Sequence, residues 1–322
     1  MRSINRAGGV LAGLLLVALS AAPALACGGL IGPNGAVNLL RTTTFAGYHD
    51  GVEHYITSFE FAGGGGAFGS LTPLPGVPTS VEKGGDWTLQ RLRRETEPQD
   101  LRLRAASFAD GAAAESAEVL MEVQIDALDI TVLRGGADEV GVWAKDHGFR
   151  LPPDAPEVLE FYAARSQIFL AAAFDGEAAA ARGQNVGDGT PVHITIPTDN
   201  PWVPLRILAL GKSGTEVVEA DVYLLNDLKP AMLPAPDGFN GMTLDYSQPA
   251  SASLLADLRS DRGMEWVPEH AWLSKIALDG TAGQFGYDLA IDVSGANAPS
   301  RVAAGLDLPG ATDPAGPAML RT

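Results

Sequence analysis

The chain of 322 residues has a single cysteine, Cys27, and few basic side chains. One cysteine excludes an intrachain disulfide and leaves a thiol redox centre without a resolving partner in the chain. Lys and Arg number 22 against 39 Asp and Glu, and the formal net charge is −17. Because so acidic a chain repels phosphate backbones and has no basic stripe to offset that repulsion, we expect neither nucleic acid nor anionic lipid surfaces as partners.

Long apolar runs are also missing, apart from one near the start of the chain. Arg2 and Arg6 precede the apolar stretch Val10–Leu19, and Pro23 precedes Ala24-Leu25-Ala26. This order is typical of a secretory signal peptide (residues 1–26) with an A-x-A cleavage site. The apolar stretch is half as long as the roughly 20 residues that a bilayer span needs. We therefore expect an exported protein, periplasmic or extracellular, with no transmembrane segment in the mature chain.

Cleavage would make Cys27 the mature N-terminus, and two alternatives follow. Cys27 is either the lipid attachment site of a membrane-tethered lipoprotein or the free first residue of a soluble product. A lipobox usually has leucine three residues before the cysteine, whereas Ala24 stands there and Leu25 comes one position later. Ala24 and Ala26 suit ordinary signal peptidase, which favours the soluble product.

The pattern of β-branched, aromatic and turn-forming residues predicts an α+β fold with an antiparallel β-dominated core and an inserted helix pair. Asp50-Gly51, between two such runs, is a strong hairpin signal. We expect strands over 37–45, 52–62, 118–133 (two strands with a bend), 167–174, 191–197, 203–210, 216–226, 272–278 and 286–293. We expect helices over 87–97, 137–147 and 155–166, of which the second and third form the pair, and an amphipathic stretch over 251–262.

Composition also suggests a division of the chain. Residues 27–228 are predicted to form the main α+β domain, and the proline-rich stretch 229–241 reads as a linker. Residues 242–298 would then form a small C-terminal α+β region, and 299–322 a loose tail.

His49, Glu53 and His54 are the candidates for a metal site. The zinc pattern H-x-x-E-H has one intervening residue fewer and lies on a helix. On a hairpin, Glu53 and His54 would point to opposite faces of the sheet. The favoured interpretation is that these are polar residues at an exposed hairpin tip, and we expect no bound metal.

Two glycine-rich stretches resemble nucleotide-binding loops only formally. Gly64–Gly69 satisfies G-x-G-x-x-G, but Pro73, Pro75 and Pro78 forbid the helix that the dinucleotide motif requires. Gly211-Lys212-Ser213 resembles the end of a P-loop, yet Arg206 occupies the position of the first glycine. We therefore expect a loop or bulge at the first stretch, a hairpin turn at the second, and no cofactor.

The remaining candidates for catalysis are isolated in the sequence. His147, His193 and His270 have no G-x-S-x-G elbow or other local signature beside them, so no catalytic residue can be named. The paired acids Asp126 and Asp129 are most simply read as part of a solvated face, and the five tryptophans as core residues.

Several segments together resemble one bacterial family. They are the ACGG at 26–29, SLTPLPGVP at 70–78, the helix-pair segment 132–174 with Trp143, Gly148, Phe149, Leu151, Pro152 and Tyr162, the Pro-Leu-Arg-Ile run at 204–207, and 218–227. In this order they resemble, over about residues 24–228, the exported family catalogued as domain of unknown function 2330. The resemblance implies export but no activity, cofactor or catalytic residue.

One departure from the family concerns Cys27. Members often continue CGG with two hydrophobic residues and a second cysteine, a pair that could close a small disulfide loop. Leu30 and Ile31 match, but Gly32 follows. The resemblance thus implies that Cys27 is the surviving half of a pair.

Two hypotheses for the function remain. The first is a non-enzymatic binding or interaction protein of the envelope or extracellular space, acting on an unknown protein or small-molecule ligand. The second is an exported hydrolase whose catalytic residues are not recognisable in sequence. A concave site that contains a titratable pair with perturbed pKa would favour the enzyme, whereas an exposed apolar patch would favour the binding protein.

Overall fold

The computed structural model describes residues 29–33, 35–36, 42–60, 67–97, 119–183 and 189–308. The predicted signal peptide, Cys27 and the glycine run at 63–66 lie outside these residues. No helix of the described part is long and apolar enough to cross a membrane.

The largest element is a seven-stranded sheet. Its strands, in spatial order, are β14 (Met242–Pro249), β15 (Trp272–Thr281), β12 (Val217–Asn226), β3 (Thr42–His49), β4 (Val52–Glu60), β10 (Gly189–Pro197) and β6 (Ser80–Lys83). β12 and β3 run parallel, and the other neighbouring pairs in this sheet are antiparallel.

Two further sheets complete the β core. A six-stranded antiparallel sheet has the order β2 (Gly35–Ala36), β1 (Gly29–Gly32), β5 (Phe68–Pro73), β9 (Ile168–Phe174), β8 (Leu128–Arg134) and β7 (Val119–Ile125). A three-stranded sheet joins β11 (Trp202–Val203), β16 (Leu289–Asp292) and β13 (Ala231–Leu233).

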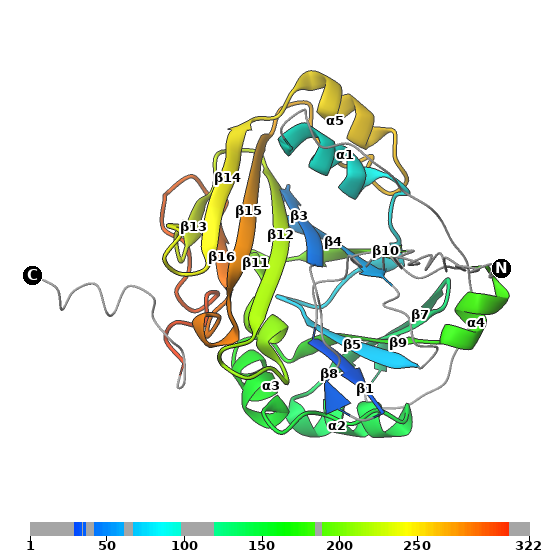
Figure 1. Ribbon diagram of the computed structural model, residues 1–322. Coiled ribbons are helices and arrows are strands. Elements are labelled where there is room, and N and C mark those ends of the chain that lie inside the picture. Colours follow the sequence, from blue (N-terminus) through cyan, green and yellow to red (C-terminus); the bar gives the residue numbers. More distant parts are fainter. Residues whose placement is uncertain are drawn as a thin grey trace, which may run out of the picture.

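Most of the helices lie above or below the sheets in the view of Figure 1. The described helices are α1 (Thr88–Thr96), α2 (Ala137–Asp146), α3 (Ala155–Ala163), α4 (Gly176–Ala181), α5 (Ala252–Arg259) and the 3-10 turns η1 (Arg206–Ala209) and η2 (Ala282–Gln284). α1 and α5 lie together at the top of the view, and the predicted pair α2 and α3 lies at the bottom. The predicted α+β class, with an antiparallel β core and a helix pair, is confirmed.

The seven-stranded sheet is covered on both faces, so its strands contribute to two cores. On β12, Val222 packs into the larger core between the two large sheets, whereas Tyr223 packs into the smaller core against α1 and α5. Leu92 of α1 and Leu254 and Leu258 of α5 are fully buried in that smaller core. Since each large apolar side chain contributes about 1.5–3 kcal/mol on burial, these contacts hold the two helices on the sheet.

The predicted hairpin is present. Asp50 and Gly51 have φ angles of 49° and 79°, the left-handed pair that a tight two-residue β-turn requires. Asp50 and Gly51 are exposed and connect β3 to β4.

The strand predicted over 203–210 is wrong. β11 ends at Val203, and η1 follows. The backbone N–H groups of Leu205 and Arg206 donate to the buried Asp288 carboxylate at 2.7 and 3.0 Å. Because these donors turn inward to a side chain, they are not available for a strand ladder. Residues 211–215 are consequently a turn between η1 and β12, not a hairpin turn.

The proline-rich stretch 229–241 does not separate two sheets. It contains β13, and the strands that follow it, β14 and β15, join the same sheet as β12 and β3. The start of the predicted tail is packed as well, since Ala303, Ala304 and Leu306 are buried. Gly305 lies so close to Phe161 that a Cβ atom would stand 2.2 Å from its ring, so only glycine fits there.

Candidate functional site

The three metal candidates of the β3–β4 hairpin do not converge. His49 is half-buried, and its Nδ1 lies 2.8 Å from Oδ1 of Asp227. Glu53 is fully buried and His54 is 9% exposed, which corrects the prediction of an exposed hairpin tip. The reason is that β10 pairs with β4 along its whole length, down to Pro197 opposite Val52, and both faces of the sheet are covered. No group of three or more His, Cys, Asp or Glu that could hold a metal occurs among the described residues.

His54 instead forms a pair with a histidine of the neighbouring strand. Its Nδ1 lies 3.0 Å from Nε2 of His193, which is 2% exposed. Trp266, from the segment after α5, stacks flat on the His54 ring at 3.8 Å between centroids and 4° between planes. Gly47, directly opposite His54 on β3, makes this possible, because a Cβ there would stand 2.2 Å from the indole.

Burial keeps both histidines neutral. It lowers the pKa of His54 to about 3, with further lowering by His193 and His49. It lowers the pKa of His193 to about 4, although Glu265 acts in the opposite direction. Oε1 of Glu82 stands 3.7 Å from Nδ1 of His193. At neutral pH the pair is therefore one N–H···N hydrogen bond between two neutral rings under an indole.

Glu53 faces the other core, as the alternation of a strand predicts. Burial raises its pKa to about 8, and the Trp202 backbone opposes this effect only in part. Neither carboxyl oxygen has a hydrogen-bond partner of good geometry. Tyr48, opposite Glu53 on β3, donates to the Thr198 carbonyl at 2.9 Å. Glu53 is thus a neutral carboxylic acid at pH 7, buried between sheets and separated from His54 by the sheet itself.

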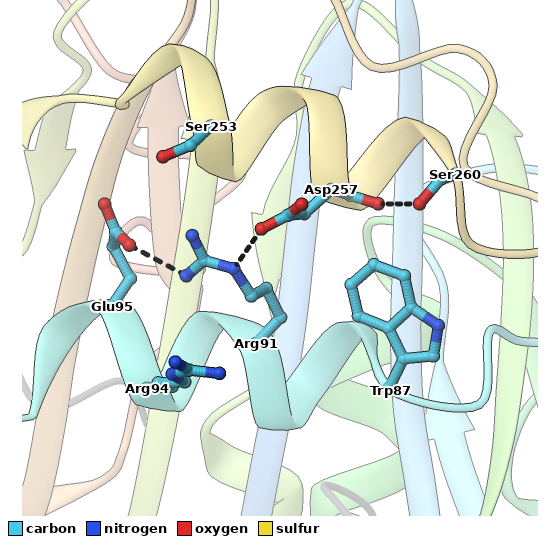
Figure 2. Close-up of a pocket in the computed structure, with 7 residues that line it drawn as sticks. All are labelled: Trp87, Arg91, Arg94, Glu95, Ser253, Asp257 and Ser260. Carbon is cyan, nitrogen blue, oxygen red and sulfur yellow. Dashed lines mark hydrogen bonds and ion pairs between the residues drawn. The ribbon is translucent and has the colours of Figure 1, made fainter.

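A groove lies between α1 and α5, the two helices that contribute to the smaller core. It has a volume of about 530 Å³. Figure 2 shows its seven lining side chains, which are Trp87, Arg91, Arg94, Glu95, Ser253, Asp257 and Ser260. None of the three perturbed groups, Glu53, His54 or His193, is among them.

Arg91 is held at the centre of this groove by two carboxylates, one from each helix (Figure 2). Its Nη1 lies 2.7 Å from Glu95 and its Nε 2.8 Å from Asp257. Burial disfavours charge on Glu95, but hydrogen bonds from Arg91 and Ser251 outweigh it and lower the pKa of Glu95. Arg94 is exposed and forms no ion pair with a described residue. The groove therefore combines the fixed cation of Arg91, a second cation, Arg94, that no described residue pairs, hydroxyl groups and the indole of Trp87.

Asp261, just after α5, sets the position of α1 across the groove. Its carboxylate accepts from the backbone N–H groups of Asp86 and Trp87, both at 3.1 Å, and from the Thr88 hydroxyl at 2.7 Å. α1 has no side-chain cap of its own, so Asp261 satisfies its N-terminal donors from another element. Gly85 permits the approach, since a Cβ there would stand 2.1 Å from Asp261.

The groove was missed in the sequence because its two walls are about half the chain apart. The only local sign is the i, i+4 spacing of Arg91 and Glu95, which is typical of any exposed helix. Trp87, read as a core residue, lines the groove. His193 was read as an isolated strand residue, since nothing in the sequence places it beside His54.

Two acids predicted to lie on a solvated face are partly withdrawn from solvent. Asp126 is 5% exposed, and its Oδ2 lies 2.5 Å from Nζ of Lys83. Burial raises the pKa of Asp129, which lines a smaller hollow of about 130 Å³ beside His147. Asp126 is buried because its left-handed turn, φ 54°, carries it inward against β6.

The segments that carry the family resemblance meet in one buried network. Asp288 accepts from the Tyr162 hydroxyl at 2.9 Å and pairs with Arg165, both near the end of α3. The Tyr162 hydroxyl in turn accepts from the Ile207 backbone at 2.8 Å. Because Asp288 is fully buried and both of its carboxylate oxygens have partners, this network fixes η1 to the helix pair.

Comparison with known proteins gives a family but no activity. No curated protein matches the chain. Solved structures of baculovirus P35 are similar at low identity: mutated P35 after caspase cleavage (TM-score 0.44, 8% identity, 79% of this chain and 99% of that one) and P35 itself (TM-score 0.41, 10% identity, 79% and 96%). Residues 21–236, well over half of the chain, match the family described as "Uncharacterized protein conserved in bacteria (DUF2330)", and the chain therefore belongs to this family.

Proposed function

We propose that the protein is an exported, non-enzymatic binding protein of the cell envelope or extracellular space, and that the groove between α1 and α5 is its ligand site. The observation that carries this proposal is that the groove and the buried groups with large pKa shifts lie in different parts of the molecule. In the groove, the ion pair of Arg91 and Glu95 shifts both pKa values away from neutrality, raised for Arg91 and lowered for Glu95, whereas the groups with the large shifts, His54, His193 and Glu53, are buried elsewhere.

The chemistry of the groove supports a small polar ligand without net charge. Two arginines and two carboxylates balance each other, while the hydroxyls of Ser253 and Ser260 add hydrogen-bonding groups. The ion pairs of Arg91 span both walls and reduce the ordering that binding would otherwise require. The indole of Trp87 supplies a flat apolar surface beside these polar groups. Together they suit a compact molecule with hydroxyl or amide groups on one side and an apolar face on the other.

The alternative, an exported hydrolase, depends on the buried groups. A neutral carboxylic acid and a neutral histidine pair are chemically able to move protons at pH 7. They lie on opposite faces of a sheet, however, and His54 is covered by Trp266. A hydrolase would need substrate to reach one of them. Labelling of the protein by a panel of serine- or acid-directed activity probes would favour this alternative.

A thermal-shift screen tests the binding proposal. Mono- and disaccharides, amino acids and amides are screened against the wild type and against Ser253→Trp, which fills the groove from α5. Ala252→Trp, on the same helix but outside the groove lining, is the matched control. We expect some compounds to raise Tm in the wild type and in Ala252→Trp but not in Ser253→Trp. Equal shifts in all three proteins, or no shift in any, would contradict the proposal.

Export is part of the same proposal and rests on the pattern of residues 1–26. The acidic composition suits a soluble secreted protein but does not by itself indicate its location. We propose that Cys27 is the free N-terminal residue of the mature chain and not a lipid attachment site.

A further inference from the structure

Phe239 is the most exposed large apolar side chain of the described residues, at 91% of its surface. It lies in the loop 234–241 between β13 and β14. Single exposed apolar residues are common on protein surfaces, but most of them cover part of their area against neighbours. An aromatic ring presented almost completely to solvent calls for an explanation from its surroundings.

The loop holds this ring on a rigid backbone. Oδ1 of Asp237 accepts from the N–H groups of Phe239 and Asn240 at 2.9 and 3.2 Å. The Asn240 side chain bridges the Ala235 carbonyl and the Met242 N–H. The buried Tyr287 hydroxyl donates to the Asn240 carbonyl at 2.9 Å. The residues on both sides of Phe239 are therefore fixed, and only the ring projects.

Two acidic residues belong to this loop or adjoin its backbone, since Asp237 lies within it and the Asp279 N–H donates to the Gly241 carbonyl at 2.9 Å. Gln284 Nε2 donates to the Phe239 carbonyl and joins the loop to η2. Asp237 and Asp279 are exposed, and neither forms an ion pair with a described residue. We call Phe239, Asp237, Asp279 and Gln284 the Phe239 surface.

We propose that the Phe239 surface docks into a partner protein through an apolar pocket rimmed by lysine or arginine. The ring supplies a preorganised anchor, since little backbone freedom remains to be lost on binding. Aromatic residues are enriched at the centres of interfaces. The carboxylates of Asp237 and Asp279, which form no ion pair with a described residue, favour a basic rim, and the net charge of −17 steers the approach of such a partner.

This surface is separate from the groove. β14 begins at the loop, at Met242, and ends at Pro249 just before α5. The eight residues of β14 therefore separate the Phe239 loop from α5 by about 26 Å, at 3.3 Å per residue. The docking proposal therefore does not depend on what the groove binds, and the two proposals can be tested separately.

Peptide selection tests the proposal with a defined probe. A phage-displayed library of random peptides is selected on Ser253→Trp, so that groove-binding peptides are not enriched. Affinities of the selected peptides are then measured on the wild type, Phe239→Ala, Asp279→Lys and Val302→Ala. Val302 is 57% exposed on a different segment and serves as the matched control.

We expect peptides with a bulky apolar cluster flanked by Lys or Arg. Their affinity should fall at least tenfold, or about 1.4 kcal/mol, in Phe239→Ala. It should also fall in Asp279→Lys with a weaker dependence on salt, and stay unchanged in Val302→Ala. Acidic consensus peptides, no binders, or binding that is insensitive to Phe239→Ala would overturn the proposal. Phe239-dependent binding to phosphatidylcholine vesicles would also overturn it, because the ring would then serve a membrane.

Discussion

Glu53 and His54 are consecutive in the chain, yet they face different cores and their pKa values are shifted in opposite directions. Burial raises the pKa of Glu53 and lowers that of His54, because in both cases it disfavours the charged form. His193 behaves like His54. Glu53 therefore lowers folding stability as pH rises, and the two histidines lower it as pH falls.

Glu53→Gln should remove the loss of stability toward higher pH. The folded-state pKa of about 8 lies above the ordinary 4.5, so the folded protein retains a proton that the unfolded chain releases. The contribution of Glu53 is therefore full below pH 4.5 and is lost as pH rises toward 8. Urea unfolding at pH 5, 6, 7 and 8 should show the variant gaining up to about 1.4 kcal/mol per pH unit over the wild type. Parallel pH profiles would contradict this assignment.

His193→Asn should flatten the acid side of the same profile. Both histidines have folded-state pKa values below the ordinary 6.5, so the unfolded chain binds more protons and stability falls as pH drops from about 6.5 toward 4. In the variant, the slope of the unfolding free energy against pH should be smaller by up to about 1.4 kcal/mol per pH unit. His270→Asn, at an exposed position, is the control and should keep the wild-type slope. An unchanged slope in His193→Asn would mean that the pair is charged or solvated.

At the scale of elements, local patterns predicted those parts that local contacts determine. Asp50-Gly51 marked the hairpin, and the apolar face of Val140, Trp143 and Ala144 marked α2. The 203–210 segment was mispredicted because Asp288, about 80 residues later, binds its backbone N–H groups. The groove could not be predicted, since Arg91 and Asp257, which meet in it, are 166 residues apart in the chain.

Asp261→Ala should destabilise the protein by about 2–4 kcal/mol, because it removes a charged acceptor from two backbone N–H groups and one hydroxyl at the start of α1. Denaturant unfolding of the variant measures this loss. Asp86→Ala, at an exposed neighbour, should stay within about 0.5 kcal/mol. Equal effects of the two substitutions would show that α1 does not depend on Asp261.

At the scale of the whole molecule, composition and residue pattern indicated the fold class. Because a single cysteine allows no intrachain disulfide, stability depends on packing, and two cores lie on either side of one sheet. The break at 229–241 reads as a linker because prolines are frequent in it. Its strand β13 nevertheless pairs with β16, and β15 pairs with β12 along ten residue pairs, which no local pattern reveals.

Intact mass spectrometry of protein secreted by its bacterial host tests the proposed processing. We expect the unmodified mass of residues 27–322, since Ala24 and Ala26 suit signal peptidase. A diacylglyceryl adduct on Cys27 would make the protein a lipoprotein, and retention of residues 1–26 would contradict export by cleavage.

The central claim, that the groove between α1 and α5 binds a ligand, is tested most directly by fluorine NMR of protein labelled with 5-fluorotryptophan. The chain has five tryptophans, and Trp87→Phe assigns the resonance in the groove. With any compound that raises Tm, we predict that the Trp87 resonance shifts while those of the buried Trp143 and Trp202 do not. A shift of the Trp266 resonance beside His54, with that of Trp87 unmoved, would contradict the claim and place the site at the histidine pair.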